Sequence, residues 1–213
     1  MALIKYKLGS LITQSELRNS DNAYTVESVV GLSTQKQTIK TKADMEGVSL
    51  TSYKLMPPHY FAYVPDTSRR GDKISLALNT TAETFLVSSI SVVFSVSRSD
   101  ILLTDYLFMY FNRPEFDFNS WGSARETFDW SEMCDIDIEL PPIEIQQKYV
   151  DIYNAMLANQ RDYENGLEDL KLACFAMADH FKHIKRKMPV GELLEEVDVR
   201  NSEGVCDSAQ GIN

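Results

Sequence analysis

Cysteine and glycine are scarce in this sequence, with three and nine residues among 213, and long apolar runs are missing. The cysteines, Cys134, Cys174 and Cys206, are odd in number and widely spaced. That pattern favours reduced thiols over a disulfide framework or a zinc site. No segment approaches the ~20 apolar residues that cross a bilayer, and residues 1–7 lack a signal-peptide pattern. We therefore expect a cytoplasmic protein that does not enter a membrane.

Signatures of catalysis are also missing. No glycine-rich turn for S-adenosylmethionine or nucleotide phosphates follows a strand pattern. Residues 56–59 (MPPH) lack both ends of the adenine methyltransferase signature, and Asp72 is directly adjacent to Lys73, which does not fit a nuclease motif. His180 and His183 form an isolated i, i+3 pair, which is typical of a helix surface rather than a metal site. We expect no catalytic residue, no metal site and no cofactor held by this chain.

Positive charge is scarce overall, since the formal net charge is -10. This total argues against a polyanionic partner. Residues 1–82 nevertheless carry ten Lys or Arg against seven Asp or Glu, concentrated in residues 36–42 and 68–73. A local basic patch can bind phosphates on an otherwise acidic protein. Solvated loop charges without a ligand are the alternative interpretation.

Residues 1–140 mix short apolar runs with turn signals, which predicts an α+β globular domain. The clearest strand pattern is Phe85–Val96, because it is rich in β-branched and aromatic residues. Further strands are predicted at residues 24–30, 52–55, 60–64 and 136–140. A short helix is predicted over residues 105–111, where apolar residues follow helical spacing.

Residues 141–187 predict one long helix. The proline pair at 141–142 suits a helix start, and a basic run at 185–187 precedes Pro189 at its end. Apolar residues recur at steps of three and four, with one step of seven that holds Asn159 and one irregular step of four after Tyr163. The resulting seam consists of Ile145, Tyr149, Ile152, Met156, Tyr163, Leu167, Leu170, Cys174, Met177, Phe181 and Ile184.

Such a seam is typical of a coiled coil. At ~1.5 Å per residue the helix would be roughly 70 Å long, whereas a domain of this size is about 30 to 40 Å across. About half of the seam would therefore extend beyond the domain. We expect it to pair with a second helix, with packing on its own domain as the alternative.

The end of the chain resembles its beginning. Residues 8–22 align without gaps on residues 190–204, and five of the fifteen positions are identical, including Gly9, Leu11 and the Arg18-Asn19-Ser20 triplet. The separation is too long for a solenoid repeat. The pattern predicts three parts, which are a domain at 1–140, a helix at 141–187 and the partial start of a second copy at 188–213.

This order of motifs resembles the specificity subunit of type I restriction-modification enzymes. The proline pair in residues 140–147 (LPPIEIQQ) resembles that family's entry into its spacer helix. Other matching motifs, in chain order, are residues 61–63 (FAY), 70–74 (RGDKI), 87–89 (VSS), 93–94 (VF), 105–107 (DYL) and 122–125 (GSAR). No single motif is highly specific, but their order is.

The resemblance implies a non-catalytic target recognition domain that reads one half of a split DNA site. It also implies a helix that acts as a spacer and a modification subunit as partner, which carries S-adenosylmethionine. The ATP-driven restriction subunit would be a second partner. This chain departs from the full pattern because it has only one complete recognition domain. Two copies paired through the helix, as a homodimer, would restore the symmetry and read a palindromic site.

Double-stranded DNA would be held by two groups of side chains. Phosphate contacts are expected from the basic residues, which supply affinity without sequence information. They are Lys36, Lys40, Lys42, Arg69, Arg70 and Lys73. Base readers are expected at Asn112, Arg113 and Arg125, because their side chains present paired donors or acceptors. A coiled-coil adaptor that binds only proteins remains the alternative function.

Overall fold

The structure is a computed structural model that describes residues 3–41, 43–65, 74–113, 116, 127–182 and 189. The chain divides into two units, Met1–Ala158 and Asn159–Asn213. Strands β1 to β5 are Ile4–Lys7, Ile12–Ser15, Val30–Leu32, Thr38–Lys40 and Lys54–Met56. Strands β6 to β10 are Phe61–Tyr63, Leu76–Leu78, Phe85–Val87, Val92–Val96 and Asp137–Leu140. The helices are η1 Leu8–Ser10, η2 Val26–Ser28, α1 Thr104–Phe111, α3 Trp130–Asp135 and α4 Ile143–Lys182.

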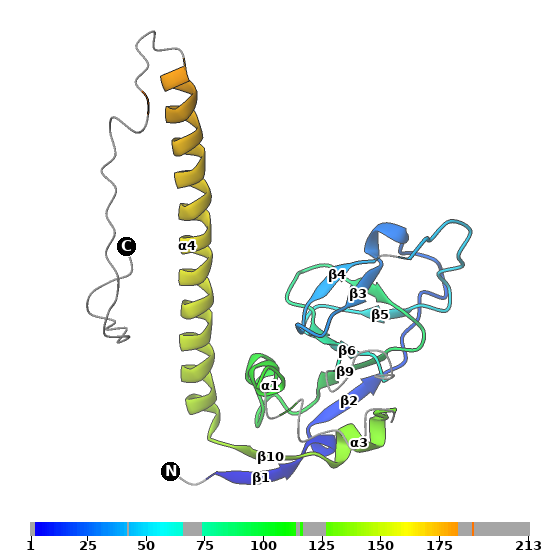
Figure 1. Cartoon of the computed structure of the whole chain (residues 1–213). Helices are drawn as coiled ribbons and strands as arrows, with labels where there is room; N and C mark the ends of the chain where they lie inside the picture. The colour runs from blue at the N-terminus through cyan, green and yellow to red at the C-terminus, as the bar shows by residue number, and fades with distance from the viewer. Residues whose placement is uncertain are drawn as a thin grey trace, which may run out of the picture. The chain divides into compact units, whose positions relative to one another are not determined.

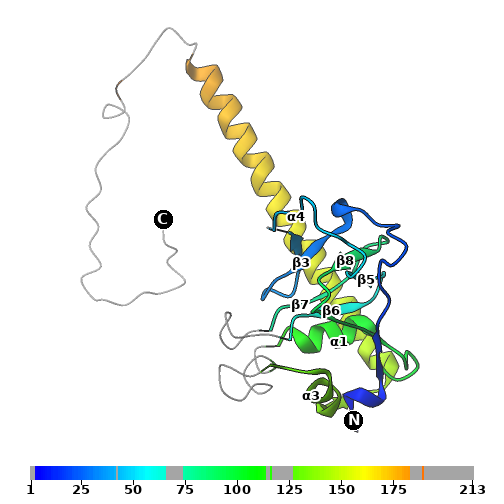
Figure 2. The same ribbon diagram turned by 90° about the vertical axis from the view of Figure 1, so that its right-hand side faces the viewer.

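An antiparallel sheet of strand order β2-β9-β6-β7 forms the middle of the domain. Successive side chains of a strand point to opposite faces, so each strand contributes to two cores. Phe61 and Phe94 stack at 5.0 Å on one face, and Phe111 of α1 meets Phe61 edge-on at 5.6 Å. Val93 packs on the opposite face with Met56 and other residues of the second core. Helix α1 lies beside this sheet in both views (Figure 1 and Figure 2).

The predicted strand Phe85–Val96 is wrong as a single element. Its first part, β8, pairs with β5, whereas its second part, β9, pairs with β2 and β6. A turn separates them, in which the Ser91 N–H donates to the Ser88 carbonyl at 2.9 Å and Ile90 is exposed. Strand propensity is high on both sides of this turn, so pairing with two different sheets decides where the chain bends.

The other predicted elements agree with the structure to different degrees. The strand predicted at 24–30 is wrong, because η2 occupies Val26–Ser28 and β3 begins only at Val30. The strand predicted at 52–55 begins two residues later and ends one residue later, as Lys54–Met56. Strands β6 and β10 and helix α1 lie within one residue of their predicted positions. An α+β domain followed by a long helix is therefore confirmed.

The first and last strands of the domain pair with each other. Strand β1 lies antiparallel to β10, with Ile4 opposite Leu140 and Lys7 opposite Asp137 (Figure 1). Helix α3 precedes β10 and begins at a capping box, in which Asp129 accepts from the Ser131 and Glu132 N–H groups and the Glu132 carboxylate accepts from the Asp129 N–H. The chain therefore enters and leaves the domain side by side.

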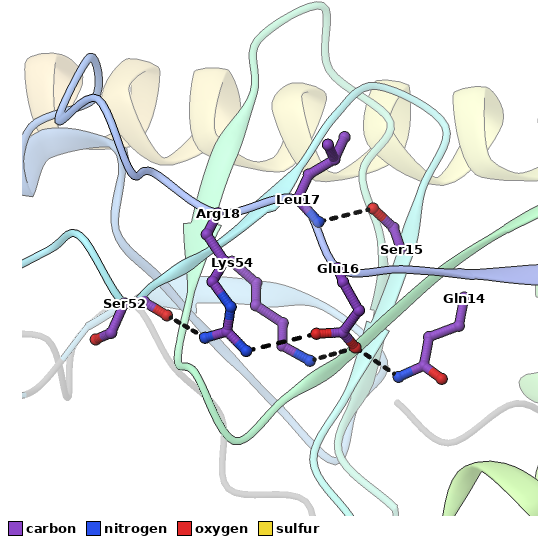
Figure 3. Close-up of polar contacts among 7 residues, drawn as sticks. All are labelled: Gln14, Ser15, Glu16, Leu17, Arg18, Ser52 and Lys54. Atoms are coloured by element: carbon purple, nitrogen blue, oxygen red, sulfur yellow. Dashed lines mark hydrogen bonds and ion pairs between the residues drawn. The ribbon is translucent and has the colours of Figure 1, made fainter.

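The motif that recurs near the end of the chain has a structural role. Asn19 is buried, and its side chain forms two hydrogen bonds with the backbone of Tyr24. Arg18 donates to the Ser52 carbonyl at 2.9 Å, and Glu16 forms ion pairs with Arg18 at 3.4 Å and with Lys54 at 3.0 Å (Figure 3). These contacts join the segment after β2 to the start of β5. Residues 190–204 therefore repeat, in sequence, positions whose side chains hold the fold together in residues 8–22.

Helix α4 confirms the predicted long helix as far as Lys182; residues 183–188 lie outside the described residues. Its 40 residues correspond to about 60 Å at ~1.5 Å per residue. The first residues of α4 pack into the domain, where Gln146 and Val150 are buried. From Asn159 onward each side chain of the helix that the structure describes is exposed. No helix in the described ranges is long and apolar enough to cross a membrane.

Candidate nucleic-acid interface

Lys36, in the turn between β3 and β4, contacts residues that are distant in the sequence. The Lys36 ammonium donates to the Ile74 carbonyl at 3.0 Å and lies 5.8 Å from the centre of the Phe116 ring. The Phe128 N–H donates to the Pro65 carbonyl at 3.0 Å. The first two contacts join the turn between β3 and β4 to Ile74 and Phe116, and the third joins Phe128 to Pro65.

Lys36 is an anchor of this arrangement rather than an exposed cation. The residue is 5% exposed. Its backbone φ is +60°, a value that few residues other than glycine and asparagine adopt readily. Because its ammonium is buried against a carbonyl and a ring, it is not placed to contact a phosphate. We therefore correct the expectation for Lys36 and remove it from the proposed DNA contacts.

The remaining predicted cations fall into two groups. Lys40 is exposed at the end of β4, in a strand pair whose residues 29–42 contain no Asp or Glu. Lys42, Arg69, Arg70, Lys73 and Arg125 lie outside the described residues. Of the described residues that flank them in the sequence, Ile74 and Phe116 contact Lys36.

Asn112 and Arg113, at the end of α1, each form an intramolecular contact. The Asn112 amide donates to the Phe108 carbonyl at 2.9 Å, which closes the last turn of the helix. The Arg113 guanidinium lies 4.1 Å from the centre of the Tyr110 ring. Both side chains have intramolecular partners, and Arg113 lines a separate groove. The base-reading role expected of Asn112, Arg113 and Arg125 stays a prediction.

Two buried hydroxyl groups near these segments were not predicted. Tyr63 ends β6 and Ser75 precedes β7, and neither hydroxyl has a hydrogen-bond partner within the described part of the chain. Burial is the main cause that raises the pKa of Tyr63 above its ordinary value. Nothing in the local sequence distinguishes these residues from ordinary strand residues, because their burial depends on strand pairing.

A groove of about 700 Å³ lies between α1, β10 and the start of α4. Tyr106, Tyr110 and Arg113 line it from α1, and Ile145 and Tyr149 line it from α4. The Tyr106 and Tyr149 rings lie 6.3 Å apart. Asp137 and Glu139 of β10 add two carboxylates. Apolar and tyrosine side chains thus form most of the groove, beside Arg113 and two carboxylates, of which Asp137 is paired with Lys5 and Lys7.

The carboxylate of Asp137, which lines the groove, is expected to give a measurable pH dependence. Asp137 accepts from Lys5 at 2.9 Å and from Lys7 at 3.1 Å, and these two ammonium groups hold the pKa of Asp137 below its ordinary value of 3.8. The ion pairs therefore stabilise the fold fully above pH 3.8, and this contribution is lost as the pH falls through the lower folded value. Replacing Lys5 and Lys7 with alanine should raise the pKa of Asp137 in an NMR titration, whereas replacing Lys148 should leave it unchanged.

Comparison with solved structures shows a shared fold. The HsdS subunit from Thermoanaerobacter tengcongensis superposes with a TM-score of 0.54 and 18% identity, over 89% of this chain and 52% of that chain. A chain from a study of complex assembly and conformational transition in the type I R-M system gives a TM-score of 0.46 and 16% identity. That alignment covers 80% of this chain and 44% of the other. Neither the protein-family models nor the curated proteins gave a match. This chain thus has the fold of the HsdS subunit and spans about half of its length.

Proposed function

We propose that this protein is a DNA recognition subunit of a type I restriction-modification complex. The observation that carries the proposal is the contact of Lys36 with Ile74 and Phe116, because Arg69, Arg70 and Lys73 precede Ile74 closely in the sequence and Arg125 follows Phe116. Lys40 and Lys42 would follow one phosphate backbone, and Arg69, Arg70 and Lys73 would add further phosphate contacts. Arg125 would read a base edge, since a guanidinium can donate two hydrogen bonds to guanine.

The long helix would act as the spacer between two recognition domains. Each domain would read one half of a split site, and pairing of two copies through α4 would generate a palindromic target. The fold shared with HsdS supports this assignment. Methylation and cleavage would come from the modification and restriction subunits, which would hold S-adenosylmethionine, ATP and Mg²⁺. The chain itself would contribute recognition and no catalytic residue.

Selection from a random double-stranded DNA library, with the modification subunit present, tests the proposal. We expect enrichment of a split palindromic sequence. Charge reversal at Lys40 and Lys42 should weaken binding for all sequences and reduce the slope of log K against log salt by about 0.9 per lost phosphate contact. Arg125→Ala should instead relax the preference at one position of each half-site.

Lys148→Glu serves as the matched control, because Lys148 is an exposed cation on α4 and is not among the residues proposed to contact DNA. It should bind like the parent protein. The proposal fails when the library shows no enrichment and Arg70→Ala and Arg125→Ala bind like the parent. Retained capture of protein partners under those conditions would favour the adaptor function instead.

A further inference from the structure

The hairpin of β3 and β4 has a lysine where most hairpins of its kind have glycine. The Lys36 N–H donates to the Ser33 carbonyl at 3.2 Å, and the Ser33 N–H donates to the Gln37 carbonyl at 3.0 Å. These bonds close a three-residue loop whose last position has a positive φ and favours glycine. Lys36 holds that position with a φ of +60°. A side chain in this conformation persists only where the surrounding contacts hold it.

Two contacts tie Lys36 to the core of the domain. Its ammonium donates to the Ile74 carbonyl at 3.0 Å and lies 5.8 Å from the centre of the Phe116 ring. Ile74 and Phe116 both belong to the largest cluster of buried apolar residues. The tip of the hairpin is therefore fixed from below. Its outward surface includes the two residues on either side of Lys36, because Gln35 and Gln37 are both exposed.

The side-chain amides of Gln35 and Gln37 are available to a ligand. Neither forms a hydrogen bond with any residue that the structure describes. The side chains of all other glutamines in the described ranges are hydrogen-bonded, and these are Gln14, Gln146, Gln147 and Gln160. Three of those four donate to a nearby carboxylate at 2.8 Å. Residues 29–42 contain no Asp or Glu, so no neighbouring carboxylate competes for the two amides of the hairpin.

A free amide matches the edge of one base. It presents one donor and one acceptor side by side, and adenine presents an acceptor at N7 and a donor at N6 in the major groove. Guanine presents two acceptors there, which suit a guanidinium instead. A two-stranded ribbon fits this groove, because neighbouring strands lie about 4.8 Å apart and the groove is about 12 Å wide.

The surroundings of the hairpin also suit DNA. Lys40 is exposed on β4, three residues after Gln37, where it can meet a phosphate beside the groove. Strands β3 and β4 lie at the end of the domain away from β1 and β10 (Figure 1). We infer that Gln35 and Gln37 read adenine from the major groove, and that the buried Lys36 between them fixes their position. This inference rests on the proposed DNA recognition function.

Selection from a random double-stranded DNA library tests the inference, with the full chain and the modification subunit present. The parent protein should select adenine at two positions of each half-site. Gln35→Ala and Gln37→Ala should each lower that preference at least about fivefold at one of these positions and leave the others unchanged. Gln160→Ala is the matched control, because Gln160 is an exposed glutamine on α4. It should select the same site as the parent protein.

Two further variants separate direct reading from other effects. Gln37→Arg should exchange adenine for guanine at its position, since a guanidinium donates two hydrogen bonds to guanine N7 and O6. Retained preference for adenine in this variant would contradict direct reading. Lys36→Gly keeps the backbone conformation but removes the ammonium, so it should weaken the preference at both positions together. Circular dichroism during thermal unfolding verifies that each variant folds.

The outcomes distinguish this inference from the proposed function. Selection of the parent's site by both Gln35→Ala and Gln37→Ala would overturn the inference and leave DNA recognition by the protein standing. Equal weakening of binding to all sequences would overturn it too, because that is the behaviour of a phosphate contact. A parent protein that enriches no sequence would contradict the proposed function, and base reading by the hairpin with it.

Discussion

Replacing Gln146 with leucine should lower the free energy of unfolding of the domain by about 3 kcal/mol. Gln146 is completely buried in the first turn of α4. Its side-chain oxygen accepts from the Leu103 N–H at 3.0 Å, and its amide donates to the carbonyls of Ile101 at 2.7 Å and Pro141 at 2.9 Å. Leucine fills similar space but leaves these buried backbone groups without partners. Denaturant unfolding followed by tryptophan fluorescence measures the loss.

Gln147 supplies the control for this prediction. It is the adjacent residue with the same side chain, but it is exposed and bonds only to Asp151 on the helix surface at 2.8 Å. Gln147→Leu should change the free energy of unfolding by less than about 0.5 kcal/mol. Similar losses for both variants would show that the connection between α4 and the loop before α1 does not depend on Gln146.

Gly9→Ala should destabilise the domain by about 2 to 3 kcal/mol. A Cβ at position 9 would lie 2.6 Å from the Cβ of Cys134 and 3.0 Å from its Cα. Both are atoms close to or in the backbone, so no rotation of the cysteine side chain relieves the overlap. The first turn after β1 would have to move away from α3. Thermal unfolding measured by calorimetry provides the readout.

A double-mutant cycle identifies the cause of that loss. Cys134→Gly removes the nearest clashing atom, so combining it with Gly9→Ala should cost less than the sum of the two single changes. Strict additivity would indicate that the effect of Gly9→Ala has another origin. Gly191 occupies the matching position in residues 190–204, which suggests that a second copy would meet the same constraint.

The long helix was predictable because its signals are local. The proline pair, the acidic first turn and the spacing of apolar residues all lie within the segment that they specify. The division of Phe85–Val96 into β8 and β9 was not predictable in this way. Its cause is pairing with β5 on one side and with β2 and β6 on the other, and these partners are distant in the sequence.

The candidate site shows the same limit. The basic character of residues 36–42 is visible in the sequence, but the burial of Lys36 depends on the Ile74 carbonyl and the Phe116 ring. A lysine next to other cations resembles an exposed residue until its tertiary partners are known. Arg113 likewise reads as a free guanidinium, although it lies over Tyr110 at the edge of an aromatic groove. Composition indicated a basic region, and long-range contacts decide which of its described side chains are exposed.

Because β1 pairs with β10, the segment between them could be replaced as a unit. Residues 8–136 begin after β1 and end before β10, and Lys7 lies opposite Asp137 in this strand pair. A different sequence grafted between these two strands would keep the proline pair and the start of α4 in place. Under the proposed function, altered DNA preference would be gained by changing the inserted segment alone, without redesign of the helix that is proposed to set the distance between half-sites.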